Sequence, residues 1–253
     1  MGGTVSGPYE GDRMSARNKI KTYIRGFDEQ LDGGIPECSV VLLVGEPGTM
    51  KSSVAFSILY NNAKNDGVKG LYISLEQSRS SILDHMEGLG MDMSAVEDNV
   101  HLLDLGLIRK NLKMLGDQTW MHVFKMYAEN LKNSTDYSLL VLDSLPVLEL
   151  LAQFKEPRTE LFQFFEWLRE LGITTILISE MGAAATSYAK HDEDFLSDGI
   201  IHLKMEKVDD VNIQRRIRAV KMRSCNHSAN YFTLLFGEGG FQTTKVIGES
   251  SFK

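Results

Sequence analysis

Short apolar runs alternate with amphipathic segments along most of the chain. The runs that have the length and composition of buried strands lie at 40–44, 71–75, 100–104, 138–144 and 173–180. Helical spacing of apolar residues predicts helices directly after Ser52, from Ser78 to about Leu89, from Thr119 to about Asn133 and from Arg158 to Leu171. Strands that alternate with helices predict an α/β fold, with a mostly parallel, twisted sheet flanked by helices.

Beyond Asp198-Gly199 the apolar period changes from helical to alternating. Strands are predicted at 200–206, 213–222 and 231–236, with polar turns between them. They form a C-terminal antiparallel extension of the sheet. We expect irregular loops at 145–158 and 181–195, and residues 105–118 give no clear pattern.

The chain has no linker that would divide it. We expect a flexible leader at 1–17, one folded domain at 18–245 and a short tail at 246–253. The 253 residues are 43% hydrophobic and 24% charged, which is ordinary for a globular protein with a sizeable core.

Composition also narrows the location and the partners. No apolar run reaches the length of a membrane span and no secretory signal opens the sequence, so we expect no membrane insertion. Cys38 and Cys225 lack metal-ligand spacing, which favours reduced thiols in a cytoplasmic protein. The net charge of −7 gives no broad attraction to nucleic-acid phosphates.

Residues 45–52, Gly-Glu-Pro-Gly-Thr-Met-Lys-Ser, join the first apolar run to a helix. Strand, glycine-containing loop, Lys-Ser and helix form the context in which a P-loop binds nucleotide phosphates. The backbone N–H groups and the positive end of the helix dipole would face one anion. Lys51 would reach the β- and γ-phosphates, and the Ser52 hydroxyl would ligate Mg²⁺.

Met50 stands where the usual pattern G-x-x-x-x-G-K-[ST] has glycine. A Cβ there crowds the phosphates unless φ is negative and the side chain turns away. A glycine-rich turn without a ligand is the alternative, but one mismatch leaves the Lys-Ser pair and its context intact. The open question is whether the site hydrolyses a nucleotide or only holds it.

Three acidic candidates for the site stand at the ends of predicted strands, at the edge where open α/β sheets place their chemistry. Asp143 is a Walker B candidate that would hold Mg²⁺ directly or through water, or else a turn residue. Glu76 is a candidate to orient and deprotonate a water molecule, with an uninvolved surface glutamate as the alternative. Ser179 and Glu180 lie where either a γ-phosphate sensor or a surface pair is expected.

Lys221-Met222-Arg223 closes the predicted strand 213–222. Strand alternation puts Lys221 and Arg223 on one face. They form either a surface charge pair or a finger that reaches the phosphates of a neighbouring subunit.

Several short segments, taken in order, resemble one known family. They are Gly26-Phe27-Asp28 with Gly33-Gly34-Ile35-Pro36, the P-loop, Ile73-Ser74-Leu75-Glu76, Leu142-Asp143-Ser144, Phe195-Leu196-Ser197-Asp198-Gly199, and Lys221-Met222-Arg223 with His227. Over roughly residues 19–242 the chain resembles a single KaiC-type domain of the RecA-like P-loop ATPases. The resemblance implies a RecA-like core, ATP and Mg²⁺ as ligands, and a homo-oligomer with ATP between subunits, for which a hexamer is favoured.

The resemblance also implies roles for single residues. Glu76 would be the catalytic glutamate and Asp143 the Walker B acid, with Lys51, Lys221 and Arg223 as further catalytic candidates. The residues that would hold the phosphates and Mg²⁺ are Gly45, Gly48, Thr49, Met50, Lys51, Ser52 and Ser53. The residues that would approach the nucleotide from the adjacent protomer are Lys221, Met222, Arg223, Cys225 and His227.

Two residues depart from the family pattern. Met50 replaces the P-loop glycine, and Gln77 stands where the clock protein of this family has a second glutamate. The sequence has one such domain and no long C-terminal tail with phosphorylation sites. We therefore do not expect the protein to act as a circadian autokinase. We expect an ATP-binding, slowly hydrolysing switch or assembly factor with an unidentified protein partner. A nucleotide sensor or scaffold without turnover is one alternative.

A recombinase-like DNA-binding ATPase is the other alternative. DNA contact would need basic or aromatic loops after the fourth and fifth strands. The first loop has only Lys155 and Arg158 as basic residues, and the second carries Asp192-Glu193-Asp194. We therefore do not expect nucleic acid as a partner.

Overall fold

The structure, a computed structural model, describes residues 18–106, 119–182 and 187–246. The predicted leader and all but the first residue of the predicted tail lie outside these ranges. The N-terminal elements are β1 (Lys19–Ile20), η1 (Asp28–Leu31), β2 (Ile35–Pro36), β3 (Val40–Gly45), α1 (Lys51–Asp66), β4 (Gly70–Ser74), α2 (Arg79–Gly88), η2 (Met93–Ala95) and β5 (Val100–Asp104). They are followed by α4 (Trp120–Thr135), β6 (Leu139–Asp143), α5 (Leu145–Ala152), α6 (Pro157–Glu170), β7 (Thr174–Glu180), α7 (Glu193–Leu196), β8 (Gly199–Lys207), β9 (Ile213–Met222), β10 (Phe232–Gly237) and β11 (Gly240–Lys245).

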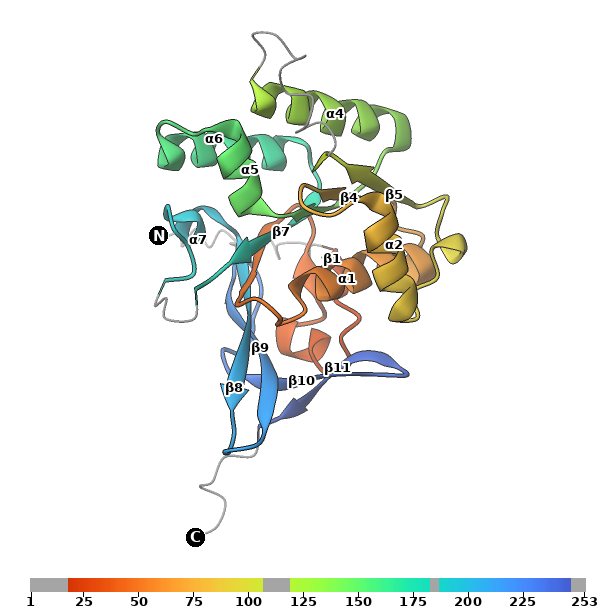
Figure 1. Ribbon diagram of the computed structural model, residues 1–253, viewed down its shortest axis with the longest axis vertical. Helices are drawn as coiled ribbons and strands as arrows, with labels where there is room; N and C mark the ends of the chain where they lie inside the picture. The colour runs from red at the N-terminus through yellow and green to blue at the C-terminus, as the bar shows by residue number, and fades with distance from the viewer. Residues whose placement is uncertain (1–17, 107–118, 183–186, 247–253) are drawn as a thin grey trace, which may run out of the picture.

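The predicted α/β fold is confirmed. A nine-stranded sheet has the order β11-β10-β9-β8-β3-β7-β6-β4-β5, and β1 and β2 form a separate small sheet. Strands from β8 to β5 along this order pair in parallel, whereas β8, β9, β10 and β11 pair antiparallel. The β8–β9 hairpin projects from the body of the molecule (Figure 1).

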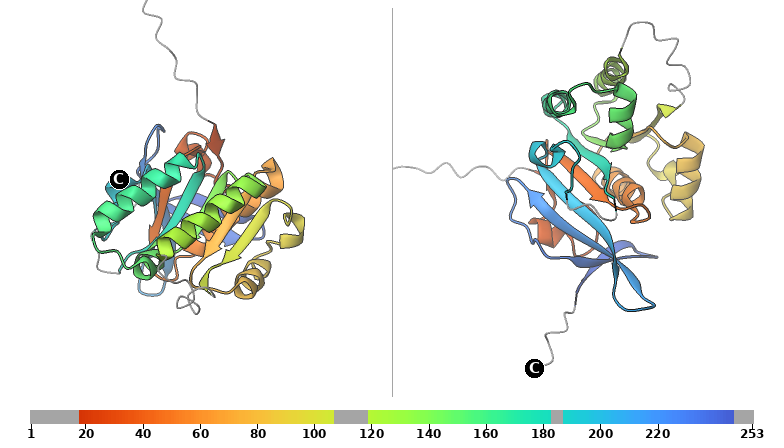
Figure 2. Two further views of the ribbon diagram at one scale, coloured as in Figure 1. Left: turned by 90° about the horizontal axis from the view of Figure 1, so that it is seen from above. Right: turned by 60° about the vertical axis from the view of Figure 1, so that its left-hand side comes forward.

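Two apolar layers sandwich the parallel part of the sheet. In β3, Val41 and Leu43 belong to the core beneath α1 and α2, whereas Val40, Leu42 and Val44 belong to the core beneath α4, α5 and α6. Figure 2 shows α4 and α6 side by side over the second face. A strand buried on both faces must be apolar at every position, which explains the uninterrupted run at 40–44.

Three features of the fold differ from the sequence prediction. Residues 145–152 form α5 instead of a loop, because Pro146 fits the first helical turn and the leucines bury one side against β7 and α4. The short helix α7 lies in the expected acidic loop, and its Glu193 is buried. The fourth antiparallel strand, β11, was not predicted, and it pairs with β10 from Gly237↔Gly240 to Phe232↔Lys245.

No helix in the described part of the chain is long and apolar enough to cross a membrane.

The parallel pairing brings the carboxyl ends of four strands to one edge. Gly45 at the end of β3 pairs with Glu180 at the end of β7, and Ser74 at the end of β4 pairs with Asp143 at the end of β6. The loop between β3 and α1 starts at this edge, so the sheet register positions the candidate site.

Candidate functional site

A cavity of about 490 Å³ lies at this edge of the sheet. The predicted site residues that line it are Gly48, Met50, Lys51, Ser52, Ser53, Glu76 and Asp143. Gly45 does not line the cavity, but a Cβ at this position would lie 2.4 Å from the carbonyl oxygen of Leu203, so only glycine fits.

Thr49 closes the turn of the loop instead of facing the cavity. Its hydroxyl donates to the Glu46 carbonyl at 2.7 Å, its N–H points to the same oxygen at 3.4 Å, and the residue is fully buried. The expectation that Thr49 holds phosphate therefore has no support from its side chain here.

Met50 adopts the left-handed conformation that glycine would adopt, with φ 70° and ψ 31°. The first condition for an uncrowded loop, a negative φ, is therefore not met, because the chain turns sharply here to start α1. The Met50 side chain is half-buried and packs against the core beneath α1. Met50 therefore contributes both to this core and to the lining of the cavity.

The first turn of α1 offers donors to an anion. The N–H groups of Lys51, Ser52 and Ser53 have no backbone acceptor in the described chain, as expected at a helix N-terminus. The Ser53 hydroxyl lies 3.1 Å from Nε2 of His85, a residue on α2 that also lines the cavity. These donors fit the phosphate-binding part of the predicted site.

Lys51 is the central cation of the cavity. It is 8% exposed, and its Nζ donates to the carbonyls of Gly45 at 2.9 Å and Glu46 at 3.0 Å. Burial lowers the pKa of Lys51, while the carboxylates of Glu180, Asp143, Glu76 and Glu46 act in the opposite direction. The ammonium group is thus surrounded by acidic side chains but bonded only to backbone, so it can accept phosphate oxygens as partners.

Asp143 is 9% exposed at the end of β6. The Tyr72 hydroxyl donates to its Oδ2 at 2.5 Å. Burial raises the pKa of Asp143, and hydrogen bonds from the hydroxyls of Tyr72 and Ser52 partly offset this shift. The two predicted Mg²⁺ ligands, Ser52 and Asp143, are therefore brought together.

This pair fits a magnesium ion bound with a nucleotide. Mg²⁺ usually takes one or two protein oxygens and completes its octahedron with water and phosphate oxygens. Within the described ranges, His, Cys, Asp and Glu side chains form no group of three or more that could hold a metal ion by themselves. The donor set fits a metal bound together with a nucleotide better than a closed metal cage.

Glu76 is oriented by a residue that the sequence argument did not single out. The Ser144 hydroxyl donates to Oε1 of Glu76 at 2.6 Å. Glu180, weighed only as an alternative, also lines the cavity, and so does Gln77. Tyr72, Ser144 and His85 were missed, although Ser144 directly follows the acid of the Walker B candidate, which was an available signal.

The proposed finger residues lie elsewhere in the single chain. Lys221 Nζ donates to the carbonyls of Asp194 at 2.8 Å and Ser197 at 2.7 Å. Arg223 donates from Nη1 to Oδ1 of Asp198 at 3.2 Å and from Nη2 to the Phe195 carbonyl at 3.1 Å. Both side chains reach one segment around α7, and neither lines the cavity of the P-loop.

The other residues expected from the adjacent protomer also lie outside the cavity. The Met222 side chain is 3% exposed in the core, so only its backbone is available to a ligand. The Cys225 thiol donates to the Leu31 carbonyl at 2.9 Å, and burial raises its pKa. Nδ1 of His227 lies 3.3 Å from the Cys225 carbonyl oxygen.

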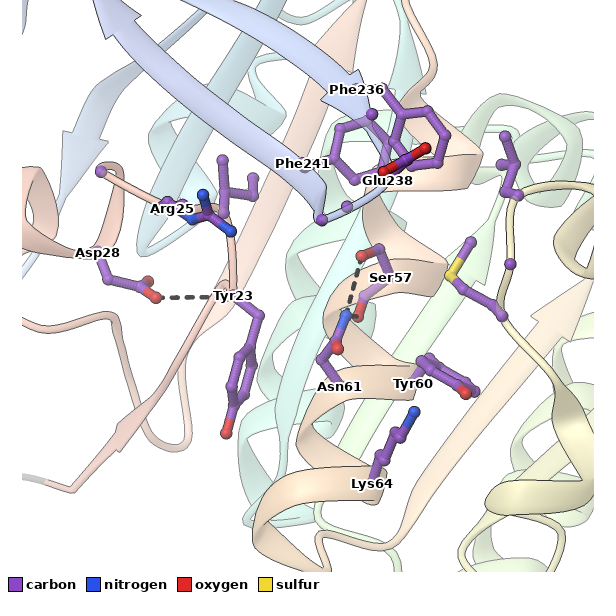
Figure 3. A pocket seen from close by; sticks show the side chains of 18 of the residues that line it. Tyr23, Arg25, Asp28, Ser57, Tyr60, Asn61, Lys64, Phe236, Glu238 and Phe241 are labelled. Atoms are coloured by element: carbon purple, nitrogen blue, oxygen red, sulfur yellow. Dashed lines mark hydrogen bonds between the residues drawn. The ribbon is translucent and has the colours of Figure 1, made fainter.

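A second cavity of about 650 Å³ opens further along α1 (Figure 3). Ser57, Asn61 and Lys64 come from α1, and Phe236 and Glu238 come from the β10–β11 hairpin. Ser57 and Gly88 line this second cavity, whereas Ser53 and His85, about one helical turn earlier on α1 and α2, line the first. The two cavities therefore follow the same pair of helices.

Residues 20–245 match the family profile described as "ATPase: KaiC". The circadian clock protein KaiC2 of Synechocystis sp. is 26% identical over 231 residues, which cover 90% of this chain and 40% of KaiC2. The chain thus spans less than half the length of that relative. A UPF0273 protein of Thermotoga maritima is 27% identical over 218 residues, with 83% of this chain and 89% of that protein covered.

Structural similarity agrees with the profile. The crystal structure of a KaiC-like protein from Pyrococcus horikoshii OT3 matches with a TM-score of 0.78 at 26% identity, covering 90% of this chain and 99% of that one. The profile match spans nearly all of the described chain, and the protein therefore belongs to the KaiC family of ATPases.

Proposed function

We propose that the protein binds ATP with Mg²⁺ and hydrolyses it slowly. The observation that carries this proposal is the convergence of Lys51, Ser52, Asp143 and Glu76 on one cavity at the N-terminus of α1. Family membership supports an ATPase activity, and the geometry supports the residues that would perform it.

Each group in the cavity has a distinct proposed role. Lys51 and the free N–H groups of α1 bind the phosphates, and Ser52 and Asp143 hold Mg²⁺. The ion, when bound, neutralises charge on the transferring phosphoryl group. Glu76, oriented by Ser144, positions the attacking water and accepts its proton.

The helix pair α1–α2 offers a path for the rest of the nucleotide. With the phosphates at Ser53 and His85, the nucleoside would extend along α1 and α2 toward the second cavity. That cavity presents Tyr60 and Phe236 as apolar surfaces and Ser57 and Asn61 as hydrogen-bonding groups.

We further propose that the protein is a nucleotide-dependent switch or assembly factor in the cytoplasm. ATP would lie between subunits of a homo-oligomer, where Lys221 and Arg223 of one copy approach the phosphates of the next. Two observations support this: both cations are gathered at one surface segment, and the cavity of their own chain does not include them. Cys38 and Cys225 are free thiols, which fits a reducing compartment.

Phosphate release, measured together with the mass in solution with and without Mg-ATP, tests the proposal. We expect slow turnover and a nucleotide-dependent increase from monomer to a ring. A monomer under all conditions would overturn the interfacial site but leave ATP binding intact. Tight ATP binding without any turnover would instead support the sensor function, which the left-handed Met50 in the binding loop favours.

A further inference from the structure

A cationic and aromatic cluster lies on one face of the β8–β9 hairpin, outside the nucleotide cavity. The strand register pairs His202 with Arg218 and Lys204 with Arg216, and directly paired residues share a sheet face. Tyr231 and Tyr188 complete the β8–β9 cluster: the Tyr231 hydroxyl lies 2.9 Å from Nδ1 of His202, and Arg218 donates to the Tyr188 hydroxyl. We propose that the β8–β9 cluster binds a phosphate group.

The charge of the cluster is unbalanced. Lys204, Arg216 and Arg218 give three positive charges, and Glu206 is the one carboxylate paired with them in the described chain. Lys204 Nζ and Arg216 Nε each approach a different oxygen of Glu206, both at 2.7 Å. The excess is therefore 3 − 1 = 2 positive charges, in a chain whose net charge is −7.

Arg218 is the cation of the cluster that lacks a carboxylate partner. No carboxylate pairs with it among the residues that the structure describes, and its Nε is buried without an acceptor. Its guanidinium carbon lies 4.6 Å from the ring centroid of Tyr231, over which Lys204 Nζ also lies, at 4.2 Å. Two cations that share one ring repel each other, and an anion bound beside them would offset that repulsion.

The donors favour phosphate over carboxylate. A phosphate monoester carries about −1.5 to −2 charges at neutral pH and so matches an excess of two, whereas a carboxylate would leave one charge unmet. The planar guanidinium can bind two phosphate oxygens, and the tyrosine hydroxyls can donate to a third. Burial, with Arg218 and Lys204 nearby, lowers the pKa of His202 to about 4, so its ring adds no charge at neutral pH.

The phosphate could belong to a small-molecule monoester or to a nucleic-acid backbone, where each diester phosphate carries one charge and two neighbouring phosphates would match the excess of two. Equilibrium binding of inorganic phosphate and of a ten-nucleotide oligothymidylate, each measured separately, distinguishes these sources. The P-loop also binds phosphate in our proposal, so binding of inorganic phosphate that persists in Lys51→Ala would assign a small-molecule site at the β8–β9 cluster. Binding of the oligonucleotide alone, with a steep salt dependence, would assign backbone phosphates.

The deciding comparison is Arg218→Gln against Arg215→Gln. Arg215 lies on the same strand but pairs with Met205 on the opposite face, so both variants lose one charge and both keep the P-loop. We expect Arg218→Gln to weaken phosphate or oligonucleotide binding at least tenfold, Arg215→Gln to change it less than twofold, and Arg218→Lys to retain part of it. Equal losses in the two glutamine variants, or binding of neither probe by the wild type, would overturn the proposal.

Discussion

The cations proposed to act on ATP lie in two places with opposite surroundings. Lys51 is almost buried and faces acidic side chains of its own chain across a cavity. Lys221 and Arg223 are held by carbonyls around α7 and by Asp198, and the Arg223 side chain remains 53% exposed. The first cation is buried beside a cavity that its own chain forms, whereas the other two lie near the surface around α7.

The difference shows how much of an ATPase site one chain can build. The carboxyl ends of parallel strands meet at one edge, so a single chain can bring together the phosphate-binding and metal-binding groups. A cation on β9, three strands away from β7 in the sheet order, has no route to this cavity within its own chain. The proposed catalysis by Lys221 and Arg223 therefore depends on assembly.

The sharpest test of the P-loop cavity is Lys51→Ala. Loss of the buried ammonium group removes a preorganised charge from the phosphates, and we expect turnover to fall about 1,000-fold. ATP affinity should fall with it in a direct binding assay. Lys125→Ala is the control, because Lys125 packs over the Trp167 ring and does not line the P-loop cavity. It should leave turnover and ATP affinity near those of the wild type.

The role of Glu76 is tested by Glu76→Gln. Loss of the proposed general base should lower turnover about 100-fold while ATP affinity stays within about threefold. Ser144→Ala keeps the carboxylate but removes its 2.6 Å hydrogen bond, so a smaller loss of about tenfold is expected. An unchanged rate of phosphate release in Glu76→Gln would rule out the assigned role.

Arg223→Ala tests whether the cations around α7 act on another subunit. We expect about a tenfold loss of turnover in the assembled protein, since Arg223 would stabilise charge on the neighbour's phosphates. Mixing Arg223→Ala with Lys51→Ala subunits should restore part of the activity, because one supplies the cavity and the other the arginine. Absence of any recovery in an assembled mixture would argue that Arg223 only fastens the segment around α7.

Asp198→Asn sharpens the same comparison. Asp198 also accepts from the Val40 N–H at 3.0 Å and from Arg169 Nε at 3.3 Å, so it ties the start of β3 and α6 to the finger. We expect a loss of turnover similar to that of Arg223→Ala, with a lower melting temperature. Arg169→Gln should lower the melting temperature without the same loss of turnover.

Glu149 on α5 lies close to α7, the helix whose carbonyls hold Lys221, and it should make the thermal stability of the protein depend on pH. Burial and the neighbouring carboxyl group of Glu193 raise the pKa of Glu149 to about 7, and Lys190 acts in the opposite direction. Nε2 of His191 lies 3.7 Å from Oε2 of Glu149. A raised carboxyl pKa stabilises the fold below the unfolded value of about 4.5, and this contribution is lost as pH rises through about 7. Melting temperatures from pH 4.5 to 8 should therefore fall more in the wild type than in Glu149→Gln, and parallel curves would contradict this assignment.

The smallest effect is expected at Met50. A non-glycine residue in the left-handed region costs on the order of 1–3 kcal/mol, but glycine loses about 0.5–1 kcal/mol through greater freedom when unfolded. The free energy of unfolding of Met50→Gly should therefore stay within about 1 kcal/mol of the wild type. Met50→Ala loses the packing but keeps the strain, so it should be the less stable variant in urea unfolding.

Most of the regular structure was predictable from local pattern. Helix α2 begins after Ser78, whose hydroxyl accepts from the Ser81 N–H, and α4 begins after Thr119 in the same way. Residues 145–152 were not predicted, because seven apolar residues in eight positions lack the amphipathic contrast of a surface helix. The candidate site was predicted where a motif fixes neighbouring residues, as in the P-loop, and missed where the contact joins two strands, as between Tyr72 and Asp143.

By itself, the sequence determined the strands of the large sheet other than β11, the loop that begins α1 and the acids that end β6 and β7. Those features follow from the period of apolar residues and from residue types that a local backbone geometry requires. Only the tertiary structure decided that Ser144 orients Glu76, that Met50 keeps a left-handed backbone, and that α7 holds Lys221. These outcomes depend on strand order and register, because residues far apart along the chain meet only when the sheet aligns them.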